Sequence, residues 1–303
     1  MIDRKPLDAT AFAVMPLLCA VWGFQQVAVK LTAPDISLLM QGGIRSIIAT
    51  LLVYLWARWH GIALFTRDDS LVSGVAAGLL FAFEFVFIYF GLGHTAASRM
   101  SVFVYLAPVF AAVGLHSFVP GEKLRAGQWL GVLLAFAGVA VAFSENFFAA
   151  GRDTLLGDAC AVVAAVMWAG TTVVIRATNL ARVPATKTLF YQIALSALVL
   201  PIASWALGEK GVVSLSGFAI ASLAYQSVIV GFASLLAWFW LLTRYLAAPL
   251  GVLSFLTPMF GVLFGVVFLS ESISVAFLLA ALLVAAGIVL VNLRPGPARS
   301  APV

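Results

Sequence analysis

The sequence predicts an all-α membrane protein in which ten transmembrane helices form two inverted five-helix repeats around a central cavity. Three observations predict this fold: the composition, ten apolar segments of membrane-spanning length, and landmarks that recur in both halves. Of the 303 residues, 63% are hydrophobic and 10% are charged, whereas soluble domains have about 45–50% apolar and about 25% charged residues. So little polar surface cannot cover a soluble globule, and we expect the chain to fold in a lipid bilayer.

Ten segments are apolar enough to cross the membrane, since a helix needs about 20 apolar residues to span the hydrocarbon core. The first repeat, residues 1–150, is expected to contain spans at 11–33, 36–57, 71–93, 97–118 and 124–144. The second repeat, residues 151–293, is expected to contain spans at 155–178, 186–207, 216–243, 248–270 and 273–293. The remaining residues, 294–303, read RPGPARSAPV and predict a short disordered cytoplasmic tail.

The distribution of basic residues predicts that both termini are cytoplasmic. The N-terminal MIDRKPLDAT resembles the charged start of a signal peptide, but the apolar run after it is too long for one, so we expect an uncleaved first span. With a cytoplasmic N-terminus, the outer side holds four basic residues: Lys30, Arg99, Arg152 and Lys210. The cytoplasmic side holds twelve: Arg4, Lys5, Arg58, Arg67, Lys123, Arg125, Arg176, Arg182, Lys187, Arg244, Arg294 and Arg299. An excess of Lys and Arg is typical of cytoplasmic loops.

Landmarks recur in the same order in the two halves. Residues 105–110 read YLAPVF and residues 255–260 read FLTPMF. In both halves a glutamate is followed sixteen residues later by a glycine: Glu122 and Gly138, then Glu271 and Gly287. In both halves a tryptophan is followed eight residues later by a basic residue: Trp22 and Lys30, then Trp168 and Arg176. Because each repeat has an odd number of helices, the second is inverted, as in many secondary transporters. Channels also contain inverted repeats, and the symmetry could serve packing alone.

These motifs resemble the EamA family of the drug/metabolite transporter superfamily. The segments that carry this resemblance are YLAPVF, PGEKL and GVLLAFAGVAV in one half, and FLTPMF, LSESI and LLVAAGIVLV in the other. The resemblance implies a basket in which helices 1–4 and 6–9 surround the cavity and helices 5 and 10 are peripheral. It also implies export of amino acids or other small metabolites. The acid in helix 3 and the aromatic residue before the helix-4 proline are similar to those of bacterial aromatic amino-acid exporters.

Glu84 is an acid within the apolar stretch LLFAFEFVFIYF, about two thirds of the way along the third span. A charged side chain near the bilayer centre costs about 2.5–3.5 kcal/mol on insertion scales, so such residues face cavities or partners. We expect Glu84 to line the cavity, where it binds a substrate ammonium or carries a coupling proton. A protonated, hydrogen-bonded structural role is the alternative.

Arg45 lies about ten residues into the second span. It can snorkel to the interface, pair with an acid, or bind a substrate carboxylate. An amino acid needs a partner for each of its charges, and Arg45 and Glu84 supply both if they face one cavity. The acids Glu122 and Glu271 begin helices 5 and 10, where a carboxylate favours the positive end of the helix dipole, and we interpret them as structural.

Tyr105 precedes Pro108 by three residues in the fourth span, and Pro258 occupies the matching position in the ninth. Proline removes a backbone hydrogen bond and bends a membrane helix. We therefore expect Pro108 and Pro258 to be hinges, with static bends as the alternative. Tyr105 is expected to stack on or hydrogen-bond to a substrate.

Aromatic and amide side chains complete the predicted site. Trp22 and Trp168 match across the repeat and lie well inside their spans, whereas tryptophan in membrane proteins is enriched at the interface. They are candidate cavity walls, with simple packing as the alternative. Four intramembrane amides either line the cavity or join helices: Gln25, Gln41, Gln192 and Gln226.

The absent motifs restrict the function. There is no phosphate-binding G-x-x-x-x-G-K-[ST] loop for an ATP-driven pump, the two cysteines form no metal or disulfide pattern, and the three histidines do not cluster. The net charge of +5 is scattered, which does not indicate nucleic-acid binding. The sequence predicts a secondary transporter of the bacterial inner membrane without cofactor or metal, which exports amino acids with aromatic or apolar side chains or similar metabolites. An exporter of other metabolites or drugs, a channel, and an intramembrane enzyme are the alternatives.

Overall fold

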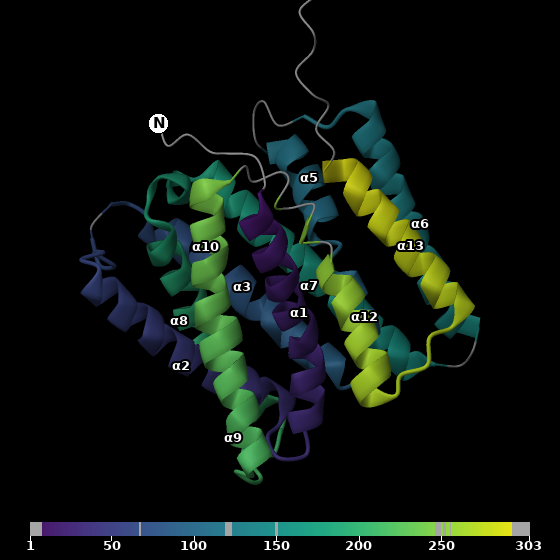
Figure 1. Cartoon of the computed structure of the whole chain (residues 1–303), viewed down its shortest axis with the longest axis horizontal. Coiled ribbons are helices and arrows are strands. Elements are labelled where there is room, and N and C mark those ends of the chain that lie inside the picture. Colours follow the sequence, from purple (N-terminus) through teal and green to yellow (C-terminus); the bar gives the residue numbers. More distant parts are fainter. Residues whose placement is uncertain are drawn as a thin grey trace, which may run out of the picture.

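The computed structural model describes residues 8–66, 68–118, 123–148, 151–245, 250, 253–254 and 256–292. The first half contains α1 (Ala9–Thr32), α2 (Leu38–Trp59), α3 (Leu71–Leu92), α4 (Ala97–Val104), α5 (Ala107–Phe118) and α6 (Ala126–Phe148). The second contains α7 (Arg152–Ala177), η1 (Asn179–Arg182), α8 (Ala185–Ala206), α9 (Gly217–Ala224), η2 (Tyr225–Ala233), α10 (Ser234–Arg244), α12 (Leu256–Leu269) and α13 (Val275–Asn292). Figure 1 shows that the helices form a bundle, with α6 and α13 side by side at one edge.

The described helices have the composition of a multi-pass membrane protein. Seven are long and apolar enough to cross a membrane, counting α4 with α5 and the run from α9 into α10 as one span each. Three shorter apolar helices, in α6, α12 and α13, fall within the predicted fifth, ninth and tenth segments. Every one of the ten predicted segments is therefore helical in the part of the chain that the structure describes.

The predicted fourth span is two helices rather than one. The helix α4 ends at Val104, Tyr105 and Leu106 form a turn, and α5 begins at Ala107. Pro108 explains the break, because it has no N–H to donate to Val104 and its ring clashes with that carbonyl. In the ninth segment Ser254 is likewise in a turn and α12 begins two residues before Pro258.

The predicted eighth span contains a π-helix, which the sequence analysis did not anticipate. The backbone of η2 follows α9 directly and continues into α10, where the Ser234 N–H bonds to the Ile229 carbonyl five residues earlier. π-helical segments are rare and occur frequently at functional sites. This span is therefore wider in its middle than a regular α-helix.

Helices from the two halves pack in matching pairs. The contacts between α1 and α12 correspond to those of α7 with α4 and α5, and α2 packs against α8. The helices α6 and α13 pack along each other at one edge of the bundle (Figure 1), as the resemblance implied for helices 5 and 10. Their backbones cross at two glycines: a Cβ on Gly131 would lie 2.7 Å from the Gly287 carbonyl oxygen.

Two glutamates of the second half cap helices of the first. The Glu209 carboxylate accepts hydrogen bonds from the Leu39 and Met40 N–H groups at 3.1 and 3.3 Å, at the start of α2. The Glu271 carboxylate accepts from the Ala97 and Ser98 N–H groups at 2.7 and 3.0 Å, at the start of α4. Each satisfies backbone donors that a helix cannot pair internally. Glu271 is structural, but it caps α4 rather than the helix that follows it; Glu122 lies outside the described residues.

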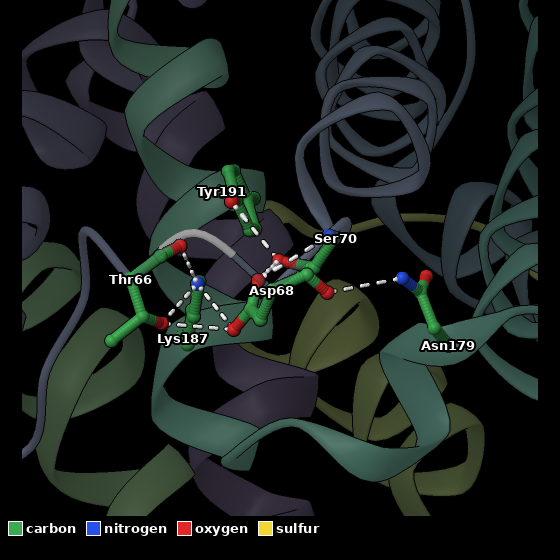
Figure 2. A network of polar contacts seen from close by, with 6 residues as sticks. All are labelled: Thr66, Asp68, Ser70, Asn179, Lys187 and Tyr191. Carbon is green, nitrogen blue, oxygen red and sulfur yellow. Dashed lines mark hydrogen bonds and ion pairs between the residues drawn. The ribbon is translucent and has the colours of Figure 1, made fainter.

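A polar network ties the α2–α3 connection to α8 (Figure 2). The buried Lys187 ammonium donates to the Thr66 carbonyl and hydroxyl oxygens at 3.1 and 2.8 Å and to the Asp68 carboxylate at 2.7 Å. The Asp68 carboxylate also accepts from the Ser70 hydroxyl, which lies 3.3 Å from the Tyr191 hydroxyl. Lys187, counted above among the cytoplasmic charges, is therefore buried in the first turn of α8, at the centre of a contact between the halves.

Candidate binding site

Arg45 and Glu84 lie near each other between α2 and α3. Both are buried, with 6% and 4% of their surface exposed, and the helices that carry them pack against each other. The Arg45 guanidinium lies over the Phe85 ring, 4.1 Å from its centroid, and 5.7 Å from that of Tyr89. Yet the two charged groups form no hydrogen bond or ion pair with each other. The structure thus holds an acidic and a basic side chain close together without a hydrogen bond between them.

Several buried polar atoms around this pair have no hydrogen-bond partner among the described residues. They include Glu84 Oε2 and the Tyr89 hydroxyl. The Gln25 side chain lies beside the Tyr89 hydroxyl, but the two do not meet the geometry of a hydrogen bond. Leaving a buried polar group unpaired costs about 1–3 kcal/mol, and native structures contain few of them. These atoms are free to form hydrogen bonds with water or with a polar ligand.

The π-helix η2 contributes two further unpaired groups next to α2. The Gln226 amide nitrogen donates to Gln41 Oε1 at 3.0 Å, which leaves its own oxygen buried and unpaired, as is the Ser227 hydroxyl. At Gly231 the same segment passes close to the Arg45 side chain. Sequence reasoning named Gln226 among intramembrane amides but gave it no place in the site, because regular α-helical spacing does not hold through η2.

Tyr105 and Trp168 meet across the halves. Their ring centroids lie 5.6 Å apart at 86°, an edge-to-face contact. The Thr257 side chain of α12 lies beside the Tyr105 hydroxyl, and the buried Thr257 hydroxyl oxygen has no hydrogen-bond partner in the described residues. Both rings pack against the same hydrophobic cluster as Phe85 and Tyr89, the rings beside Arg45. The predicted residues therefore form a charged and an aromatic group that share one cluster.

The other predicted residues lie apart from these groups. Trp22 donates its indole N–H to the Ser234 hydroxyl at 2.8 Å and makes an edge-to-face contact with Trp238 at 5.8 Å. Ser234 is the residue that matches Glu84 in the repeat. Gln192 is half-buried in α8, where its backbone carbonyl accepts from Ser196. The prolines Pro108 and Pro258 follow the helix breaks described above.

Sequence reasoning missed a buried ion pair at the other end of α3. Asp158 of α7 is fully buried and binds the Arg99 guanidinium, with Nη2 2.5 Å from Oδ2 and Nε 3.1 Å from Oδ1. The Thr95 hydroxyl donates to the same carboxylate at 2.7 Å. Arg99 had been treated as an outer-loop charge, but it lies in α4 and is buried. The available signal was Asp158 itself, an acid in an apolar run like Glu84.

Within the described residues, no group of three histidine, cysteine or acidic side chains is arranged to hold a metal ion. The two cysteines, Cys19 and Cys160, are buried and unpaired as thiols. The arrangement offers binding groups of both charges and aromatic surface.

The model of the EamA-like transporter family matches residues 10–144 and again residues 155–293. The chain belongs to this family. Its similarity to curated proteins extends over most of its length. It is 27% identical over 305 residues to the uncharacterized transporter YvbV of Bacillus subtilis (strain 168), covering 100% of this chain and 97% of that protein.

Two other relatives and one solved structure agree with this membership. The chain is 24% identical to the uncharacterized transporter YoaV of Bacillus subtilis, covering 88% of this chain and 91% of that protein. It is 25% identical to a "Probable amino-acid metabolite efflux pump" of Escherichia coli (strain K12), covering 90% and 91%. A protein crystal structure at 21% identity shares the fold, with a TM-score of 0.62 over 93% of this chain and 97% of that one.

Proposed function

We propose that this EamA-like transporter exports small zwitterionic metabolites, in the first place amino acids with aromatic or apolar side chains, across the bacterial inner membrane. The observation that carries the proposal is the burial of Arg45 and Glu84 on packed helices, with Arg45 over the ring of Phe85, the neighbour of Glu84, and no ion pair between the two. Ionisable residues inside a membrane are costly and mark substrate or ion pathways. A substrate with both charges satisfies both residues at once.

Each charge has a natural partner on an amino acid. The planar Arg45 guanidinium suits a carboxylate, which it can bind through two parallel hydrogen bonds. The Glu84 carboxylate suits an ammonium, and it can alternatively carry a coupling proton. Tyr105 and Trp168 supply aromatic surface for the substrate's side chain, since aromatic rings favour edge-to-face and offset contacts with one another.

Alternating access is proposed from the repeat. Two five-helix halves of opposite orientation, residues 1–150 and 151–293, would take turns in exposing the site. The matching contacts of α1 with α12 and of α7 with α4 and α5 support this, as do the broken helices before Pro108 and Pro258, since discontinuous helices line many transporter sites. The basic residues support cytoplasmic termini.

The relatives support a carrier over an enzyme or a channel. The Escherichia coli relative is named for amino-acid metabolite efflux, and a related protein can share that substrate class. Substrates of other chemistry within the same family remain the competing proposal.

The test is counterflow of a radiolabelled amino-acid panel in proteoliposomes at two pH values. Saturable counterflow is expected for zwitterions with aromatic or apolar side chains, and Glu84→Gln and Tyr105→Ala should each reduce it at least tenfold without loss of folded protein. Lys210→Gln, an exposed change in the α8–α9 connection, is the control. If both site variants transport the panel like the parent, the site is wrong. Conduction without counterflow would indicate a channel, and product formation an enzyme.

A further inference from the structure

A cavity of about 620 Å³ lies away from Arg45 and Glu84, where the α3–α4 and α12–α13 connections meet. It is bounded by Lys30 from the last turn of α1, Arg99 from α4, Thr154 from α7, and Ser272 and Phe277 from the second half. By the predicted orientation this is the outward end of the protein. The helices around it come from both halves.

The chemistry of the wall is one-sided. Lysine, arginine, histidine and hydroxyl groups line the cavity, and no acidic side chain is among its lining residues. The acids next to the lining residues are already bonded: the buried Asp158 to Arg99, and the exposed Asp153 to His94 at 2.6 Å. Glu271, whose charge acts on Lys30, accepts backbone N–H groups with both oxygens.

Lys30 is the lining cation that forms no direct ion pair among the described residues, although the charge of Glu271 acts on it from outside the lining. Its ammonium donates to the Thr95 carbonyl oxygen at 2.5 Å, and with three donors it retains two for other partners. Arg99 is neutralised by Asp158 and contributes a polar wall. A lysine flanked by hydroxyls binds phosphate as a point charge.

The cavity also adjoins apolar surface. Phe277 lines it, while the neighbouring Val275 and Leu278 of α13 are 75% and 50% exposed, as expected of side chains that face lipid. A phosphate group carried on an apolar tail would reach the cavity from that side. Its volume exceeds that of an inorganic phosphate and leaves room for the rest of a headgroup.

We propose that this cavity binds a phosphate-bearing anion through Lys30, either the headgroup of an anionic phospholipid or a soluble phosphate, at a site separate from the transport site. The ligand would bridge α1, the start of α7 and the α12–α13 connection, and would hold the two halves together at this end. Binding at this site does not require the transport function proposed above.

Two arms distinguish the sources, both with the full chain in nanodiscs. In phosphatidylcholine discs, inorganic phosphate is titrated by calorimetry. In discs that also contain phosphatidylglycerol, retained lipid is counted by native mass spectrometry without added phosphate. We expect binding in one arm that Lys30→Gln weakens at least tenfold, while Lys210→Gln, the matched change in another predicted outer connection, leaves it unaltered.

A second variant covers the case in which Lys30→Gln fails to fold. Ser272→Glu places a negative charge at an exposed position of the cavity wall and should weaken the same binding by a similar factor. Loss of phosphate binding alone would identify a soluble ligand, and loss of retained phosphatidylglycerol alone a lipid. Absence of binding in both arms, or equal binding by the parent and the variants, would overturn the proposal.

Discussion

Lys187 and Asp68 form an ion pair of 2.7 Å that joins the two halves of the chain, with the ammonium buried and the carboxylate at the surface. Lys187 first, and then the Ser70 and Thr66 hydroxyls, hold the pKa of the Asp68 carboxyl well below its usual value. Such a carboxylate stabilises the folded state above its unfolded pKa of about 3.9, and this contribution is lost as the pH falls through the folded-state pKa.

Asp68→Asn should therefore lower the thermal unfolding temperature in detergent by several degrees, because it leaves a buried ammonium without its counter-charge. The difference from the parent should be constant between about pH 5 and 8 and should shrink only below about pH 4. Asp69→Asn removes the same charge one residue along, at an exposed position, and should have little effect. An equal loss in both variants would contradict a specific role for the pair.

Asp158→Asn should destabilise the protein by about 3–5 kcal/mol, the usual cost of removing one partner of a buried ion pair. Asp153→Asn is the matched control on the same helix, since its pair with His94 is exposed, and surface pairs contribute about 0–1 kcal/mol. Equilibrium unfolding in mixed detergent measures both. Replacing Arg99 and Asp158 together with apolar residues should recover much of the loss.

Gly131→Ala should loosen the contact of α6 with α13, since the added Cβ would lie 2.7 Å from the Gly287 carbonyl oxygen. Overpacking of this kind costs about 1–3 kcal/mol. Gly127→Ala, one turn earlier on α6, meets no atom within 4 Å and should leave the unfolding temperature unchanged or slightly raised. A larger loss of stability in Gly127→Ala than in Gly131→Ala would show that α6 and α13 do not cross at Gly131 and Gly287.

Pro108→Ala should slow counterflow more than it changes stability, if the break between α4 and α5 moves during transport. Alanine restores the missing N–H and removes the clash with Val104, which favours a continuous helix. Pro258→Ala tests the matching break, and Pro16→Ala, inside the unbroken α1, is the control. If the three variants have the same transport rates and substrate affinities as the parent, the breaks are static.

The sequence predicts the ten helical segments well, because the length and apolarity of a span follow from the bilayer alone. It also predicts bends at Pro108 and Pro258, where the cause is a missing donor within the segment, but not that α4 and α5 are separate helices. It does not predict that Glu271 caps α4, because the partners are 174 residues apart and nothing in the spacing brings them together.

The candidate site shows the same division. The energetic cost of a charged side chain within an apolar span can be recognised from the local sequence, and Arg45 and Glu84 were identified as candidates in this way. Their proximity depends on how α2 packs against α3 and η2. The orientation of Gln226 was not predicted for a related reason, since it depends on a change of helical pitch that no residue of Tyr225–Ala233 signals.

The π-helix gives the eighth span a tolerance that its neighbours lack. An α-helix advances by about 100° per residue, so deleting one residue from a span that is α-helical up to Ser234 would turn Ser234 away from Trp22. Within Tyr225–Ala233 the wide turns hold surplus backbone, and a deletion there can be absorbed by tightening to α-helical pitch. A residue can thus be gained or lost in this segment during evolution while the side chains at both ends of the span keep their orientations.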